Sequence, residues 1–280
     1  MIIHVLGIAQ DGGYPHAGCN KLCCTSIWST PELHRLPSSI AAIDLKQKQF
    51  YLFDITPNIK EQLYHLNQYN CQLAGIFITH AHIGHYLGLM DLGLEVMNTQ
   101  NIPVYVMPRM KNFILNNQPM LQLVENNNIE LIQINHNQNI LFNNLSIVPF
   151  EVPHRNELSE TVGFRLLINN NSIIFLPDID DWNSWEVDLE SLVMDNDLLF
   201  LDGTFYNKSE INSRDVSKIP HPEIIDTMAR LSKLSKSYKK RVHFIHLNHT
   251  NDALRKTTSR YKNIIESGFS ISEQNQTFKF

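Results

Sequence analysis

Residues 75–89 constrain the fold of this chain more than any other stretch. They begin with an apolar run rich in β-branched and aromatic residues, which is typical of a buried strand. The run ends in three histidines, His80, His82 and His85. His80 and His82 alternate at the strand end, so both imidazoles can face one point, and His85 follows at the start of a helix. This spacing predicts a metal site, with ordinary hydrogen-bonded histidines as the alternative.

Polar residues end several other apolar runs of the chain. Because ligands gather at the carboxyl ends of strands in α/β proteins, we expect these residues to lie near the histidines. The repetition favours one shared site over several separately satisfied polar groups. The residues are His154 after residues 148–153, Asp178 after 173–177, Asp202 after 198–201 and His246 after 242–245.

The order of the predicted elements indicates an α/β protein with one domain over residues 1–280. An alternation of strands and helices runs to about residue 116, and closely spaced strands follow from residue 129. The two halves have similar strand and helix content, which predicts a pair of sheets. Predicted helices are 57–69, with Thr56 as N-cap, 86–97, 110–116, 182–194 and 222–234, and residues 169–171 (NNN) are a hairpin-turn candidate.

Charge and hydropathy narrow the partners of the protein. The net charge is −5, which argues against binding a large nucleic acid through bulk electrostatics. The first seven residues lack the basic region of a signal peptide, and no apolar run reaches membrane-spanning length. We therefore expect a cytoplasmic protein without a membrane partner.

A long irregular segment, residues 9–37, contains three of the four cysteines. Such a loop is too long for a mere connection. Cys19, Cys23 and Cys24 could give three thiolates to a structural zinc ion, but adjacent cysteines rarely bind one ion together, and a fourth ligand is absent locally. Free buried thiols are the alternative.

The motif at residues 80–85 (HAHIGH), followed in order by His154, Asp178 and His246, resembles the motifs of the metallo-β-lactamase fold over nearly the whole chain. The resemblance implies a four-layer αββα sandwich. Within that superfamily the chain is most similar to the pyrroloquinoline-quinone biosynthesis protein B group, and its layout is similar to that of PhnP-type and tRNase Z-type phosphodiesterases. The segments that carry the subgroup similarity are residues 6–13 (LGIAQDGG), 202–205 (DGTF) and 245–251 (IHLNHTN).

The resemblance implies a centre with one or two zinc ions, with manganese or iron as alternatives. Two such ions would lower the pKa of a bridging water and supply hydroxide at neutral pH. Gly84 stands where the usual motif, H-x-H-x-D-H, has an aspartate, so the second position is expected to be weaker, selective for another ion, or empty. The implied ligands are His80, His82 and His154 for the first ion, His85 and His246 for the second, and Asp178 as the bridge.

The resemblance also gives roles to residues outside the metal centre. Asp202 would orient His221 as a general acid, whereas the alternative is that His221 caps a helix beginning at Pro222. His249 would join Cys19, Cys23 and Cys24 around a structural zinc ion, although the Cys-x3-Cys-Cys spacing differs from that of the family and leaves open which cysteines bind. Asp54 would steady the histidine loop, with a buried capping carboxylate as the alternative.

These features predict a metal-dependent hydrolase that acts on a small or cyclic phosphodiester, and they are compatible with a homodimer. A second hypothesis is an iron-dependent oxidative enzyme like that proposed for the quinone-biosynthesis group, with iron held by His80, His82, His154 and Asp178. A third is that Gly84 marks a disabled site in a carrier or scaffold protein.

Overall fold

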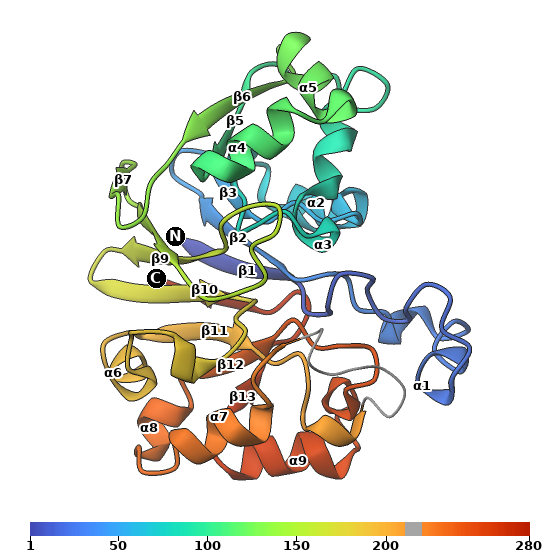
Figure 1. Cartoon of the computed structure of the whole chain (residues 1–280), viewed down its shortest axis with the longest axis vertical. Helices are drawn as coiled ribbons and strands as arrows, with labels where there is room; N and C mark the ends of the chain where they lie inside the picture. Colours follow the sequence, from blue (N-terminus) through green and yellow to red (C-terminus); the bar gives the residue numbers. More distant parts are fainter. Residues whose placement is uncertain (211–219) are drawn as a thin grey trace.

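The computed structural model describes residues 1–210 and 220–280. In this part of the chain, two seven-stranded sheets pack face to face, and helices cover the outer face of each (Figure 1). The four-layer αββα architecture predicted from the sequence is confirmed. Within the same ranges, no helix is both long enough and apolar enough to cross a bilayer.

The first sheet has the order β14-β1-β2-β3-β4-β5-β6. Its antiparallel part is β14, β1, β2 and β3, and its parallel part runs from β3 to β6. Buried apolar residues of the helices α2, α4 and α5 pack on its outer face. The bounds are β1 (Ile2–Gly7), β2 (Ser39–Asp44), β3 (Gln49–Phe53), β4 (Gln72–Phe77), β5 (Ile102–Val106), β6 (Ile129–Gln133), β14 (Thr277–Lys279), α2 (Ile59–Leu66), α3 (Ile83–Tyr86), α4 (Pro108–Leu115) and α5 (Gln118–Glu125).

The second sheet has the order β13-β12-β11-β10-β9-β8-β7. Strands β10 to β13 are parallel, and the hairpin of β9 and β10 turns at residues 169–170, as predicted, with Asn169 at a φ of 56°. The bounds are β7 (Ile140–Leu141), β8 (Ser146–Glu151), β9 (Val162–Ile168), β10 (Asn171–Leu176), β11 (Leu198–Asp202), β12 (Val242–Ile245), β13 (Ser270–Ile271), α6 (Leu189–Met194), α7 (Ile224–Arg230), α8 (Lys236–Lys239) and α9 (Ser259–Glu266).

Several predicted helices are shorter than expected. The helix expected over residues 86–97 is α3 followed by a 3-10 helix at Leu87–Leu92, because Gly88 and Gly93 disfavour a continuous helix and the Gly88 amide donates to the carbonyl of Ile55. The helix expected over 182–194 is divided, since Asp188 caps a separate α6. Helix α2 begins at Ile59 with Asn58 as N-cap, although the Thr56 hydroxyl still accepts from the Asn58 amide.

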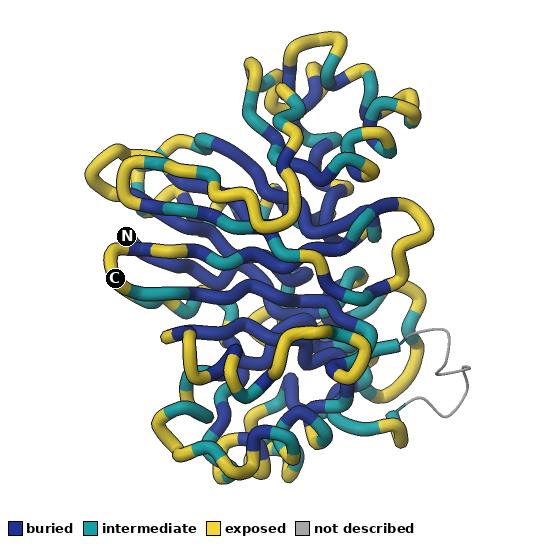
Figure 2. Tube along the Cα trace, turned by 60° about the vertical axis from the view of Figure 1, so that its left-hand side comes forward, coloured by how far each residue is buried: buried dark blue, intermediate teal, exposed yellow. Residues whose placement is uncertain are grey.

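Aromatic rings fill the space between the two sheets. Phe77 stacks on Phe53 and on Tyr105, with ring centroids 5.2 and 4.3 Å apart, and meets Phe164 edge-on. Figure 2 shows the buried strands that enclose this core. Close packing of this kind fixes the sheets relative to each other, and therefore fixes the strand ends that carry the predicted ligands.

A buried histidine of β12, away from the predicted ligands, gives a stability prediction. His243 is 7% exposed, and its Nδ1 has no hydrogen-bond partner in the part of the chain that the structure describes. Burial together with the charge of Lys240 lowers its pKa to about 4. In the unfolded chain the pKa is about 6.5. The folded protein therefore resists protonation of His243, and the free energy of unfolding falls as the pH drops from 6.5 toward 4. At pH 4.5 it is lower by about 2–3 kcal/mol than above pH 6.5.

We expect H243F to remove this part of the acid destabilisation. Urea unfolding at pH 7.5 and at pH 4.5 measures it, because the difference between the two pH values should be about 2–3 kcal/mol smaller in H243F than in the natural protein. Equal differences in the two proteins would show that His243 does not titrate in this range.

Candidate metal centre

Strand ends place the predicted ligands of the first metal position. His80 and His82 follow β4, and His154 follows β8. His80 Nε2 lies 2.7 Å from His82 Nδ1, and His154 Nε2 lies 3.3 Å from the same atom. One ligand nitrogen from each ring lies within 4.8 Å of the others, as required for three ligands of one ion.

The outward nitrogens of two of these rings, those of His80 and His154, are held by oxygen atoms. His80 Nδ1 lies 3.0 Å from the Thr79 hydroxyl, and His154 Nδ1 lies 2.7 Å from Asp180 Oδ1. Carboxylates behind histidines commonly orient metal-binding rings and raise their basicity. Asp180 was not predicted from the sequence. The sequence feature that could have indicated its role is the second carboxylate in residues 178–180 (DID), directly after β10.

Asp178 lies between the three histidines of the first metal position and a second group of potential ligands, which includes His85 and His246. Its Oδ2 is 3.1 Å from His85 Nε2 and 3.4 Å from His246 Nε2, and its Oδ1 is 3.7 Å from His154 Nε2. Asp178 therefore occupies the place expected of a bridging carboxylate. All six predicted ligands of the centre, His80, His82, His85, His154, Asp178 and His246, come together.

The second group contains a carboxylate that the sequence reasoning did not assign. Asp11 offers a ligand atom within 4.8 Å of ligand nitrogens from His85 and His246. Its Oδ1 lies 3.4 Å from His85 Nε2. The only signal for this residue was its place in the LGIAQDGG segment used for the subgroup resemblance.

Asp54 anchors the histidine loop, as predicted. Its carboxylate accepts from the amide and hydroxyl of Thr79, at 2.8 and 2.9 Å, and its Oδ2 lies 2.7 Å from His85 Nδ1. His85 Nε2 is thereby turned toward Asp178. Asp54 and His246 both have a φ of 63°, a conformation that is costly for residues other than glycine and that concentrates at functional sites.

The electrostatics of the group follow from burial and from opposite charges packed together. Burial alone would raise the pKa of Asp178, but the neighbouring histidines, His246 first, hold it well below its usual range. Burial likewise would lower the pKa of His85, yet the charges of Asp54 and Asp178 hold it well above its usual value. For His80 burial prevails, and the pKa lies well below the usual value, so the ring is neutral and can donate a lone pair.

Unpartnered atoms test whether a metal ion fits these residues. Asp11 Oδ1, Asp178 Oδ2 and His246 Nε2 are shielded from solvent and have no hydrogen-bond partner in the described part of the chain. Buried polar atoms without partners are costly, and a divalent cation would satisfy all three. The imidazole and carboxylate donors suit zinc, manganese or iron. The residues fit a metal cofactor.

His221 lies beside this centre and is paired with Asp202. Its Nδ1 is 2.7 Å from Asp202 Oδ2, and its ring centroid is 5.4 Å from that of His154. Burial would lower the pKa of His221, but the charge and hydrogen bond of Asp202 raise it. Helix α7 begins at Ile224 with Glu223 as N-cap, so the alternative that His221 caps this helix is wrong.

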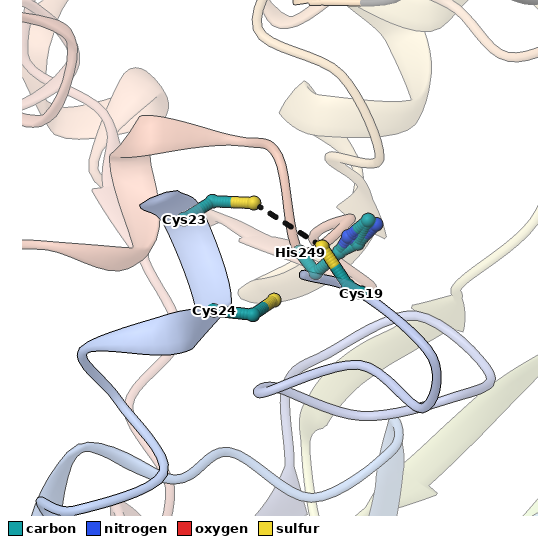
Figure 3. A group of neighbouring side chains, drawn as sticks. All are labelled: Cys19, Cys23, Cys24 and His249. Atoms are coloured by element: carbon teal, nitrogen blue, oxygen red, sulfur yellow. Dashed lines mark hydrogen bonds between the residues drawn. The ribbon is translucent and has the colours of Figure 1, made fainter. Parts of the chain in front are cut away.

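The three clustered cysteines converge with His249, as expected (Figure 3). Helix α1 (Leu22–Thr25) turns both Cys23 and Cys24 toward Cys19, so adjacency does not separate the two thiols. Cys19 Sγ and Cys23 Sγ are 3.7 Å apart, close to the edge of about 3.8 Å that a tetrahedron with Zn–S bonds of about 2.3 Å would have. The His16 amide also donates to Cys24 Sγ at 3.4 Å. A structural zinc ion at this group stays a prediction.

The model of the β-lactamase superfamily domain matches residues 50–247, which is more than half of the chain. The chain belongs to this superfamily. Coenzyme PQQ synthesis protein B of Klebsiella pneumoniae is 24% identical to this superfamily member, over 97% of this chain and 96% of the relative. A second relative with the same name, from Acinetobacter baumannii, is 23% identical, with 97% coverage of both chains. The resemblance to this group is confirmed.

Solved structures support the same fold. Zn²⁺-bound PqqB from Methylobacterium extorquens has a TM-score of 0.85 at 19% identity, with full coverage of both chains. A diphosphatase from the PhnP family has a TM-score of 0.68 at 21% identity, covering 100% of this chain and 96% of the other. The short form of human tRNase Z has a TM-score of 0.60 at 17% identity, covering 100% and 99%. These likenesses establish the shared fold.

Proposed function

We propose that this superfamily member is a metal-dependent hydrolase that cleaves a small or cyclic phosphodiester. The observation that carries the proposal is the Asp202–His221 pair, which lies directly beside the histidine and aspartate cluster. A phosphodiester needs a nucleophilic water and a proton for its leaving oxygen. The cluster and the pair provide sites for these two functions.

Each residue has a distinct part in the proposed reaction. A bound metal would supply a water that is nucleophilic at neutral pH. His80, His82 and His154 would hold one ion, with Asp178 placed between it and the second position. Asp202 holds Nδ1 of His221, so that Nε2 of the protonated ring can give its proton to the leaving oxygen.

The donor atoms support a choice of metal, and the net charge supports a choice of substrate class. We propose zinc at the active centre and a further structural zinc at Cys19, Cys23, Cys24 and His249, with manganese or iron as alternatives at the active centre. The net charge of −5 favours a small substrate over a large nucleic acid. We also propose a cytoplasmic location and a homodimeric assembly.

The proposal predicts a metal-dependent activity toward bis(p-nitrophenyl) phosphate. The protein should be stripped of metal, reloaded with zinc, manganese or iron, and assayed with each ion. Hydrolysis that requires an added ion and disappears in H80A supports the proposal. H65A, on the outer helix α2, is the control and should keep the natural rate. Absence of hydrolysis with all three ions would contradict the proposal.

The role of His221 as a general acid can be tested by changing the leaving group of the substrate. We expect H221A to reduce the hydrolysis of an alkyl phosphodiester by about 10²–10⁴-fold, because its poor leaving group needs the proton. Hydrolysis of a p-nitrophenyl diester, whose leaving group needs little help, should fall much less. An equal loss with both substrates would show that His221 only maintains the structure of the site.

A second candidate function is an oxidative step in coenzyme PQQ synthesis. It is favoured by the relatives named coenzyme PQQ synthesis protein B, which match over 97% of the chain. Iron would then be held by His80, His82, His154 and Asp178. Metal analysis after anaerobic purification separates the candidates, since one iron per active centre without phosphodiesterase activity would favour the oxidative enzyme.

A further inference from the structure

Gly84, which lacks the side chain of the usual motif, is packed against Asp11. A Cβ atom placed on Gly84 would lie 2.2 Å from Asp11 Oδ1 and 2.6 Å from Asp11 Cα. Such distances are far inside van der Waals contact. Asp11 thus occupies the space that a side chain at position 84 would need.

The carboxylate of Asp11 is directed at the second metal position. Its Oδ1 lies 3.4 Å from His85 Nε2 and belongs to one group of potential ligand atoms with His85 and His246. About a third of the side chain, 31%, is exposed, yet Oδ1 itself is shielded and has no hydrogen-bond partner among residues 1–210 and 220–280. His246 Nε2 is buried at the same place, and no described residue forms a hydrogen bond with it. A donor nitrogen and a carboxylate oxygen that lie within 4.8 Å of each other, both without a hydrogen-bond partner in the described part of the chain, suit a bound cation.

We propose that Asp11 is the carboxylate ligand of the second metal position and replaces the aspartate that position 84 lacks. The ligands of this position are Asp11, His85 and His246, with Asp178 as the bridge. The carboxylate has moved from the motif after β4 to the segment after β1, and the donor set has the same chemistry. This inference concerns metal binding and does not depend on the reaction proposed above. It also removes the basis for regarding the site as disabled.

The backbone around Asp11 is tied to the strand end that carries His246. The Gln10 amide donates to the Leu247 carbonyl at 2.9 Å, and the Leu247 amide donates to the Ile8 carbonyl at 2.8 Å. The side chain of Asn248 also donates to Gln10. Asp11 and His246 therefore lie in two paired segments, which hold their side chains in a fixed relation.

Exchange of the two residues provides the test. Isothermal titration of the metal-free protein with Zn²⁺, together with metal analysis of the loaded protein, counts the ions and measures their affinities. We expect D11N to bind one active-site ion fewer than the natural protein, or to bind it more than about 100-fold more weakly, since loss of an orienting partner alone costs about 10–100-fold. G84D alone should also lose affinity, because its side chain collides with Asp11.

The double variant D11G/G84D returns the carboxylate to position 84, but a Cβ there would still lie 2.6 Å from Cα of residue 11, so this backbone must shift. We expect the double variant to bind the second active-site ion more tightly than D11N and more weakly than the natural protein. D195N, which changes an exposed aspartate after α6, is the matched control and should titrate like the natural protein. Circular dichroism and the melting temperature report whether each variant is folded. If the double variant does not fold, the near-isosteric D11N still decides the question.

Two results would overturn the inference. The first is a natural protein that binds a single ion at the active centre. The second is a folded D11N that binds the second ion with natural affinity. Both results come from metal titration alone, so absence of phosphodiesterase activity would contradict the proposed reaction and leave this inference standing.

Discussion

Replacing Asp178 by asparagine is expected to lower the metal content of the active centre and to reduce hydrolysis by about 10²–10⁴-fold. Asp178 carries the negative charge at the middle of the centre, with ligand nitrogens of His85 and His246 3.1 and 3.4 Å from its Oδ2. Asparagine keeps the shape of the side chain but removes the charge. Breaking a buried charge pair costs about 3–5 kcal/mol, which corresponds to a rate or affinity change of that order.

Metal analysis and the rate with bis(p-nitrophenyl) phosphate, measured on the same preparations, test this expectation. D195N controls for the loss of a carboxylate elsewhere on the protein, since Asp195 is exposed after α6. A D178N protein with natural metal content but a much lower rate would place Asp178 in the chemistry instead of in metal binding. Natural values of both would show that the centre does not depend on Asp178.

The parts of the centre that follow strands were predictable from the sequence. His154, Asp178 and His246 each end an apolar run, and the parallel order of β10 to β12 brings the last two to the same edge of the second sheet. Local pattern therefore identified residues whose contacts are long-range. The same rule identified Asp54, which follows β3 and reaches His85.

Asp11 could not be predicted in this way. It lies in an irregular segment whose place is fixed by pairing with residue 247, at the other end of the chain. Sequence order gives no sign that Asp11 lies against Gly84, and a single glycine in a motif indicates only that a side chain is missing. The predicted length of the helix over residues 86–97 was wrong for a related reason. Tertiary contacts, such as that of the Gly88 amide with the Ile55 carbonyl, override the helical pattern near residue 88.

The second large effect is expected from the cysteine group. The double variant C23S/C24S should lose the proposed structural zinc ion and melt at a temperature lower by the order of 10 °C. Structural zinc contributes about 10–16 kcal/mol of apparent binding free energy, and a few kcal/mol of that lost from folding suffices for such a shift. The segment from residue 9 to residue 37 contains only short helices, so the ion is expected to provide much of its order.

Loss of this ion should also weaken the second position of the active centre. Asp11 lies in the same segment as the cysteines, and His249 follows His246 after two residues, so the second position and the predicted structural site share two supporting segments. C71S is the matched control, because Cys71 is half-buried outside the group and its thiol donates to the Tyr69 carbonyl. We expect C71S to keep all ions, whereas C23S/C24S should lose the structural ion and bind the Asp11-dependent one more weakly. Unchanged affinity at the active centre in C23S/C24S would show that the pairing of residues 8–10 with residue 247 is sufficient to place Asp11.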